Sequence, residues 1–203
     1  MEDDKKNLLK AYNMLLYFAG SLLIKEPNDE CVLDFWSTGS LKKLPVKSNN
    51  PRFINASSQL WQSEINREKL KESLINDFRL LFSEGSHSHA IPNESRYHTP
   101  HEIVTEFYRI YGWNYRIKTG LEDDHAGTEL LFLTKLIDNY LQLDDEPCRE
   151  VMKTEIRRFI DQHLLSWIPA WNYDVQEYAS TTIYKGIGNL IQASIEDIYS
   201  ILR

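Results

Sequence analysis

The segment from Glu122 to Leu143 constrains the fold most, because its apolar residues recur at helical intervals. Successive gaps of four, three, four and four residues separate Ala126, Leu130, Leu133, Ile137 and Leu141. This spacing keeps the five side chains on one face of an α-helix. Immediately before them stand Glu122, Asp123, Asp124 and His125. The segment therefore predicts a helix whose entrance is polar and ionisable and whose body is apolar.

The acids at this entrance favour a helix start. Asp123 or Asp124 is predicted to be the N-cap, since a short carboxylate accepts hydrogen bonds from unpaired backbone N–H groups. Negative charge there also suits the positive end of the helix dipole. We expect His125 in the first turn and Glu129 one turn further on, on the same face.

The rest of the chain also shows helical periodicity, and no segment reads as a convincing strand. Amphipathic patterns predict a first helix after Asp3 or Asp4, a short one through Val32 and Trp36, and further helices over Phe53–Trp61, Arg67–Phe82 (ended by Gly85), Thr99–Gly112, Pro147–Leu165 and from Val175 to the end. The prediction is a single all-α domain over residues 1–203, a bundle of roughly eight to ten helices.

The longest stretch without periodicity lies between these helices, at residues 85–98. A long loop inside a compact domain is typically functional or a hinge, so we expect a possible hinge between an N-terminal and a C-terminal helical part. Thr99 and Glu102 then have capping-box spacing, with Pro100 at the first helical position. The apolar residues predicted for this helix are Ile103, Phe107, Ile110 and Tyr111.

Charge and cysteine content narrow the function classes. A net charge of −7, with no basic recognition helix, argues against nucleic acid and anionic lipid and favours a cationic partner. Cys31 and Cys148 are far apart and form no disulfide framework, as in a reducing compartment. No signal sequence or apolar span long enough for a membrane is visible, so we expect a cytoplasmic protein without stable membrane insertion.

Histidines raise the alternative of a metal-dependent enzyme or metal-binding helical protein. Four of the six lie close together: His87, His89, His98 and His101. Imidazole suits zinc, copper or nickel, but these positions straddle a loop and a helix start. Two ExxH pairs, Glu84–His87 and Glu122–His125, resemble half of a di-iron carboxylate site, though Gly85 interrupts the first. We interpret the histidines as solvated loop residues and expect no metal and no cofactor.

Signs of catalysis are few. His125 beside Asp124 or Glu129 could serve as a general base with an orienting carboxylate. The chain has no GxSxG, no Walker A loop and no GxGxxG. The sequence therefore favours a protein that is not an enzyme and has no catalytic residues.

Four blocks of sequence, in order, resemble the TorD/DmsD family of redox-enzyme maturation chaperones. DHAGTELLFL at 124–133 resembles the family's DHxGxELxFL, and PNESRY at 92–97 resembles PxESxY. FYRIYGW at 107–113 is similar to FYRxxG, and HLLSWIPAW at 163–171 to HLxxWxPxF. Asp123 stands where the family often has proline, and Trp171 where phenylalanine is usual.

The resemblance implies an all-helical cytoplasmic chaperone that binds the twin-arginine signal peptide of a molybdenum oxidoreductase precursor. Such chaperones hold the precursor until its molybdopterin cofactor is inserted and deter premature export. Some relatives form domain-swapped dimers and some bind guanine nucleotide, so a monomer or such a dimer is expected here. No segment resembles a nucleotide-binding loop.

A twin-arginine leader joins two arginines to an apolar segment, so its receptor needs carboxylates beside an apolar groove. The expected contacts for the arginines are Glu122, Asp123 and Asp124, with His125 at the loop and Pro92, Tyr97, Trp113, Trp167 and Trp171 as walls. The expected structural residues of the motifs are Glu94, Ser95, Gly127, Glu129, His163 and Pro169. Besides peptide-binding chaperone and metal-dependent enzyme, a purely structural assembly subunit remains open.

Overall fold

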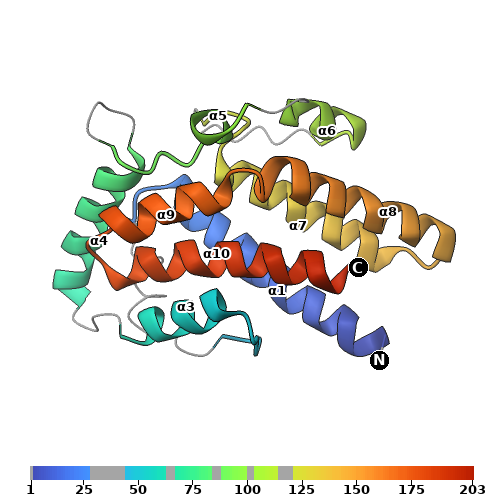
Figure 1. Cartoon of the computed structure of the whole chain (residues 1–203), viewed down its shortest axis with the longest axis horizontal. Helices are drawn as coiled ribbons and strands as arrows, with labels where there is room; N and C mark the ends of the chain where they lie inside the picture. The colour runs from blue at the N-terminus through green and yellow to red at the C-terminus, as the bar shows by residue number, and fades with distance from the viewer. Residues whose placement is uncertain (1, 28–43, 63–66, 84–87, 100–102, 114–120) are drawn as a thin grey trace.

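The computed structural model describes residues 2–27, 44–62, 67–83, 88–99, 103–113 and 121–203. Within these ranges the chain forms nine α-helices and a π-helical turn, and its one β-type contact is an isolated bridge (Figure 1). The elements are α1 (Glu2–Ile24), α3 (Pro51–Trp61), α4 (Arg67–Phe82), α5 (Glu94–Tyr97), α6 (Val104–Ile110), α7 (Ala126–Gln142), α8 (Glu146–Phe159), the π-helical turn η2 (Ile160–Leu164), α9 (Ile168–Tyr178) and α10 (Thr182–Ile201). The predicted all-α bundle is confirmed.

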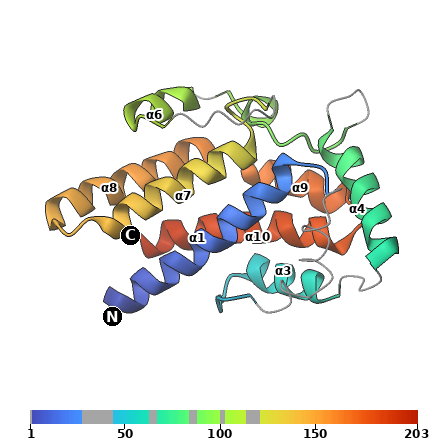
Figure 2. The same cartoon turned by 180° about the vertical axis from the view of Figure 1, so that it is seen from behind.

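Two helices that are buried on most sides, α7 and α10, form the centre of the bundle. Every residue of α7 from Ala126 to Thr134 is buried, which is more than a single apolar face. Helix α7 packs against α1 and α8, whereas α10 packs against α3, α1 and α9. Figures 1 and 2 show α1 running beside both central helices, with α3 on the outer side of α10.

A close approach of α1 to α7 depends on Gly127. A Cβ atom at this position would lie 2.6 Å from the Ile24 Cγ1 atom and 2.9 Å from the Gly20 carbonyl oxygen. Real side chains do not tolerate such distances, so the glycine permits this helix crossing. The glycine of the DHxGxEL block therefore has a packing function.

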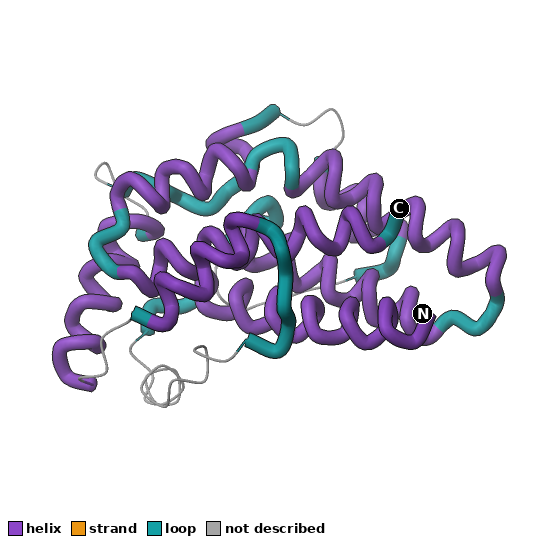
Figure 3. The backbone as a smooth tube through the Cα atoms, turned by 60° about the horizontal axis from the view of Figure 1, so that its bottom comes forward, coloured by secondary structure: helices purple, strands orange, loops and turns teal. Residues whose placement is uncertain are grey.

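Helix α4 closes one end of the bundle (Figures 1 and 3). Its aromatic residues contact residues of the C-terminal helices. The Phe82 ring lies 5.3 Å from the Tyr184 ring and 6.2 Å from the Trp171 ring, centroid to centroid. Offset and edge-on packing at these distances is favourable. The predicted boundaries of this helix, Arg67–Phe82, agree with the structure.

The prediction of one final helix from Val175 to the end is wrong. Helix α9 stops at Tyr178, Ala179 is extended, and α10 starts after Thr181, whose hydroxyl accepts from the Tyr184 N–H. Asp77 of α4 fixes this break, because its carboxylate accepts from the backbone N–H and hydroxyl groups of both Ser180 and Thr181. A contact from 103 residues earlier in the chain thus decides the boundary.

Two further helix boundaries differ from expectation. The predicted helix Pro147–Leu165 is α8 followed by η2, in which the Leu165 N–H donates to the Ile160 carbonyl. The predicted start at Thr99 is also wrong for the part that is described, since α6 begins at Val104 behind an extended Ile103.

The apolar pattern predicted for the α6 helix also needs a correction. Its buried residues are Val104, Phe107 and Tyr108, whereas Ile103 and Ile110 are 61% and 55% exposed.

Other predictions fall outside the described residues: Gly85 as a helix end, the short helix through Val32 and Trp36, and the Pro100–Glu102 part of the capping box. Nothing in the structure tests the possible hinge near 85–98, which stays a prediction. No described helix is long and apolar enough to cross a membrane.

Candidate functional site

The PxESxY and DHxGxEL blocks meet in space through an antiparallel bridge between Asn93 and His125. The Ala126 N–H donates to the Pro92 carbonyl at 2.7 Å, and the Glu94 N–H donates to the Asp124 carbonyl at 2.9 Å. A helix begins within each block, α5 at Glu94 in one and α7 at Ala126 in the other. Two segments about 30 residues apart thus form one joined pair of helix entrances.

Asp124 stabilises the start of α5 from the neighbouring loop. One carboxylate oxygen accepts from the Ser95 N–H at 3.0 Å, and the other from the Asn93 side-chain amide at 2.9 Å. Partial burial alone would raise the pKa of Asp124, but the hydrogen bonds from Ser95 and Asn93 outweigh this effect and lower it. Both oxygens of Asp124 are therefore already used by the fold.

The N-cap of α7 is His125, so the prediction of Asp123 or Asp124 at this position is wrong, as is His125 in the first turn. The His125 Nδ1 atom accepts from the Gly127 N–H at 3.0 Å, which requires the neutral ring with its proton on Nε2. Burial lowers the pKa of His125 to about 4, which favours the same neutral form. Because the Ala126 N–H donates to the Pro92 carbonyl, α7 starts one residue later than it would with Asp124 as its N-cap.

Of the three acids that precede His125, Glu122 and Asp123 are exposed. Glu122 accepts one hydrogen bond from the Asn93 side chain at 3.1 Å. The Asp123 backbone carbonyl accepts from the Tyr108 hydroxyl at 2.9 Å, while its carboxylate has no hydrogen-bond or ion-pair partner among the residues that the structure describes. Asp123 therefore presents the carboxylate most available to an incoming cation.

A depression of about 210 Å³ lies beside this carboxylate. It is lined by Glu94, Ser95, Ile103, Val104, Thr105, Asp123 and Asp124. Ile103, Val104 and Thr105 were not assigned to the site from the sequence. No local signal identified them, because the start of α6 at Val104 was not predicted.

Beneath the depression lies a buried layer of ionisable side chains. The His163 Nδ1 atom is 3.1 Å from a Glu94 carboxylate oxygen, and the Trp167 indole N–H donates to Glu129 at 3.2 Å. Glu94 is 1% exposed, and Glu129 and His163 are fully buried. Burial, and then the nearby Glu94 charge, raise the pKa of Glu129 well above its ordinary value. The predicted structural residues Glu94, Glu129 and His163 are thus placed in one layer.

Two of the predicted aromatic walls are in the core. Trp167 and Trp171 are both 0% exposed, and the Trp171 indole N–H donates to the Ala90 carbonyl at 3.0 Å. Neither indole can touch a peptide on the surface, so the expectation of direct contact is corrected. Their size and apolar character made them candidates, but the same properties favour burial.

The other predicted walls are partly accessible or structural. Tyr97 stacks on Trp167 at 5.9 Å and donates its hydroxyl to Asp174 at 3.0 Å. Trp113 packs on the Tyr108 and Phe132 rings, and Pro92 is buried. None of these side chains lines the depression. Their assignment to peptide binding stays a prediction.

The histidine alternative finds little geometric support in the described part of the chain. His89 stacks on Tyr178 with the ring centroids 4.3 Å apart, and His98 follows the last residue of α5. Among the described residues no group of three or more His, Cys, Asp or Glu side chains could hold a metal ion. His87 and His101 lie outside these residues.

Pro169, one of the predicted structural residues, occupies the start of α9, where proline is favoured, and is exposed.

Comparison with known proteins identifies the family. The family model described as nitrate reductase delta subunit matches residues 51–172. The chain is 26% identical over 191 residues to a protein named chaperone protein TorD from Photobacterium profundum, covering 88% of each chain. It is 24% identical over 204 aligned positions to the TorD chaperone of Vibrio vulnificus, covering 91% of this chain and 93% of the other. The bridged motif pair, the all-α bundle and these matches together show that the chain belongs to the nitrate reductase delta subunit family, which includes the TorD chaperones.

Proposed function

We propose that this protein is a cytoplasmic chaperone that binds the twin-arginine signal peptide of a molybdenum-cofactor oxidoreductase precursor and holds the precursor for cofactor insertion. The observation that carries the proposal is the depression between α5, α6 and the 121–125 loop, where the available carboxylate of Asp123 and the exposed apolar side chain of Ile103 are both part of the lining. It fits a peptide whose charged end is followed by an apolar segment.

Arginine is suited to this rim because its planar guanidinium donates parallel hydrogen bonds to a carboxylate. Asp123 is the acid we assign to this contact, with Glu122 as the second exposed acid. Asp124 and His125 act through the shape of the site, since their polar atoms already hold the starts of α5 and α7.

The apolar part of the leader would contact the exposed side of α6. Ile103, at the N-cap of α6, borders the depression, and Ile110, the last residue of α6, is also exposed. An amphipathic helix laid along such a face would bury apolar area, which contributes more than an exposed ion pair. A net charge of −7 also suits attraction of a cationic leader.

The proposed activity is binding and protection, with no catalysed reaction and no cofactor of the chaperone's own. Both curated relatives carry the name chaperone, which supports this class over an enzyme. The precursor would be the partner in the complex, and its oxidoreductase would receive the molybdopterin after the leader is bound.

The test is a calorimetric titration of a synthetic leader peptide with two adjacent arginines followed by an apolar segment. Asp123→Asn should weaken binding about 1.5- to 5-fold at low salt, and salt should weaken wild-type binding in the same way. The matched control is Asp144→Asn, which removes the same charge from the exposed loop between α7 and α8.

Ile103→Ser together with Ile110→Ser should weaken binding more than Asp123→Asn does, because apolar burial is the larger contribution. Wild-type affinity in Asp123→Asn and in the double isoleucine variant, with both folded, would reject this site. Equal affinity for the peptide and for one with both arginines replaced by glutamine would reject the twin-arginine function.

A further inference from the structure

A second depression lies at the seam between α1 and α7, two helices that pack side by side (Figures 1 and 2). Its volume is about 360 Å³, and it is lined by Asn13, Met14, Tyr17, Thr134 and Asp138. None of these residues lines the depression beside Asp123. The seam therefore offers a separate concave surface that the proposed leader site does not use.

Asp138 is held in place at this seam but keeps one carboxylate oxygen available. Its Oδ1 atom accepts from the Asn13 side-chain amide at 2.7 Å, which joins α7 to α1. Asp138 is exposed, and its Oδ2 atom has no hydrogen-bond or ion-pair partner among the residues that the structure describes. A carboxylate fixed through one oxygen can accept from a cation through the other with little further loss of side-chain freedom.

Asn13 supplies a second acceptor on the other helix. The residue is only 9% exposed, and its Oδ1 atom has no hydrogen-bond partner within the described part of the chain. A buried amide oxygen without a donor is costly, so a donor is missing at this place. The depression thus combines two acceptors, one from α1 and one from α7, that the fold itself leaves without donors.

Two exposed side chains of α1 complete the surface. Met14 and Tyr17 are 68% and 61% exposed, and the Tyr17 ring contacts no other ring and no cation of the described residues. Tyr17 follows Asn13 by four residues, so both lie on one side of α1. The face of a tyrosine ring attracts a cation within about 6 Å of its centre. An open ring next to a carboxylate is therefore suited to a cationic group.

We propose that the depression between α1 and α7 is a docking site for an arginine side chain of a protein partner. A guanidinium carries five N–H donors in a fixed fork, so one side chain can serve acceptors on both helices. Asp138 would neutralise its charge, Tyr17 would stack on its plane, and Met14 would contact an apolar residue beside the arginine. The net charge of −7 favours the approach of such a segment.

The test is NMR spectroscopy of the full, nitrogen-15-labelled chain during titration with the capped tripeptide Leu-Arg-Leu. We expect saturable shifts of the Thr134 and Asp138 backbone amides and of the Asn13 side-chain amide. The matched ligand carries citrulline in place of arginine, which keeps the shape and removes the charge. It should bind about 2- to 5-fold more weakly.

Two variants test the assigned contacts. Asp138→Asn keeps an oxygen for the Asn13 amide but removes the charge, and it should weaken binding of Leu-Arg-Leu about 2- to 5-fold. Tyr17→Leu keeps apolar bulk but removes the ring face, and it should weaken binding by a similar factor. Both positions are exposed, so the variants should fold. The matched control, Asp144→Asn in the exposed loop after α7, should bind as the wild type does.

Wild-type affinity in Asp138→Asn, or equal affinity for the arginine and citrulline peptides, overturns the proposal. Equal affinity for Leu-Lys-Leu overturns the assignment to arginine. The shifts are resolved residue by residue, so binding at Asp138 is recorded apart from binding at Asp123. The docking site and the proposed function can therefore fail separately.

Discussion

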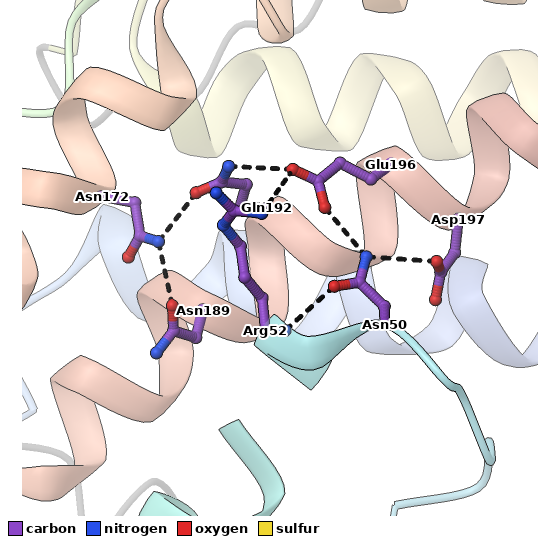
Figure 4. A network of polar contacts seen from close by, with 7 residues as sticks. All are labelled: Asn50, Arg52, Asn172, Asn189, Gln192, Glu196 and Asp197. Atoms are coloured by element: carbon purple, nitrogen blue, oxygen red, sulfur yellow. Dashed lines mark hydrogen bonds and ion pairs between the residues drawn. The ribbon is translucent and has the colours of Figure 1, made fainter. Parts of the chain in front are cut away.

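The surface where α3 and α9 meet α10 and the layer below the candidate site both bury polar side chains, but they satisfy them differently. On the α10 side, neutral amides donate and accept in a chain. The Asn172 amide donates to Asn189 at 3.0 Å and to Gln192 at 2.8 Å, and Gln192 donates to Glu196 at 2.9 Å (Figure 4). Asn50 continues the chain to Glu196 and Asp197.

Below the candidate site the buried polar groups are ionisable, and the pairing is incomplete. Glu94, Glu129 and His163 each retain an atom without a partner, whereas Asn172, Asn189 and Gln192 retain none. The hydrogen bonds among Asn172, Asn189 and Gln192 can be satisfied at every pH because amides do not titrate. The ionisable layer depends on the placement of protons.

This difference indicates separate roles for the two regions. A fully paired amide chain fixes how α3, α9 and α10 pack together and specifies one arrangement. A layer of acids and a histidine makes the geometry above it sensitive to charge. Glu94 of the ionisable layer lines the depression, whereas no residue of the amide chain does. Figure 4 shows the amide chain along α10.

The largest expected effect comes from putting a charge into the amide chain. Gln192→Glu removes the donor to Glu196 and buries a carboxylate beside another, which should lower the free energy of unfolding by about 3 kcal/mol at pH 7. Urea denaturation measures this loss. The reverse exchange, Glu129→Gln, should change stability far less, and equal losses in the two variants would remove the contrast between the regions.

A truncation in the amide chain should have the next largest effect. Asn172→Ala leaves the Asn189 and Gln192 oxygens without a donor and removes one of the two acceptors of the Gln176 amide, at a cost of about 2 kcal/mol. Thermal unfolding should show a lower midpoint. A loss no greater than that of a control, Asn55→Ala at an exposed position of α3, would mean that water replaces the buried amide without cost.

Replacing the His125 cap should lower the free energy of unfolding by about 1 kcal/mol, which is the next effect in size. His125→Ala should lose this amount at pH 7, because the Gly127 N–H loses its acceptor, whereas His125→Asn should keep the cap. Equal losses in both variants would mean that the ring acts by packing alone.

His125 also predicts an acid dependence. Its folded pKa of about 4 lies below the ordinary value, so its contribution is present above about pH 6.5 and is lost as pH falls from there toward 4. Unfolding midpoints measured across this range should fall less steeply in His125→Asn than in the wild type. Parallel curves would contradict the neutral buried ring.

An exposed ion pair supplies the smallest effect and a reference for both regions. Arg109 and Glu106 of α6 lie 2.6 Å apart, with 75% and 39% of their side chains exposed. Arg109→Gln should cost only about 0.3 kcal/mol, and less in 0.5 M salt. A loss above about 1 kcal/mol in urea denaturation would mean that this pair has a role in the fold.

Some elements follow from local sequence because their signals are local. The buried stripe of α7 and the limits of α4 come from apolar periodicity that a helix imposes on its own residues. The motif blocks contain Glu94, Glu129 and His163, which the structure brings together with Trp167 through hydrogen bonds, and their structural role stays a prediction.

Other features depended on partners distant in the chain. The break between α9 and α10 needs Asp77, and the cap of α7 shifts to His125 because the Pro92 carbonyl takes the Ala126 N–H. In the α6 region the predicted pattern was right for Phe107 but included the exposed Ile103 and Ile110, which are as apolar as the buried Val104. Composition alone cannot tell which of two apolar faces meets the core.

The sequence by itself determined the class of fold, the order of most helices and the family, because periodicity and motif spacing are properties of the chain. The tertiary structure decided which acid is available: Asp124 is taken up by the start of α5, while the carboxylate of Asp123 remains open to solvent. The physical reason is that a hydrogen-bond acceptor is free or engaged only with respect to neighbours, and folding chooses those neighbours.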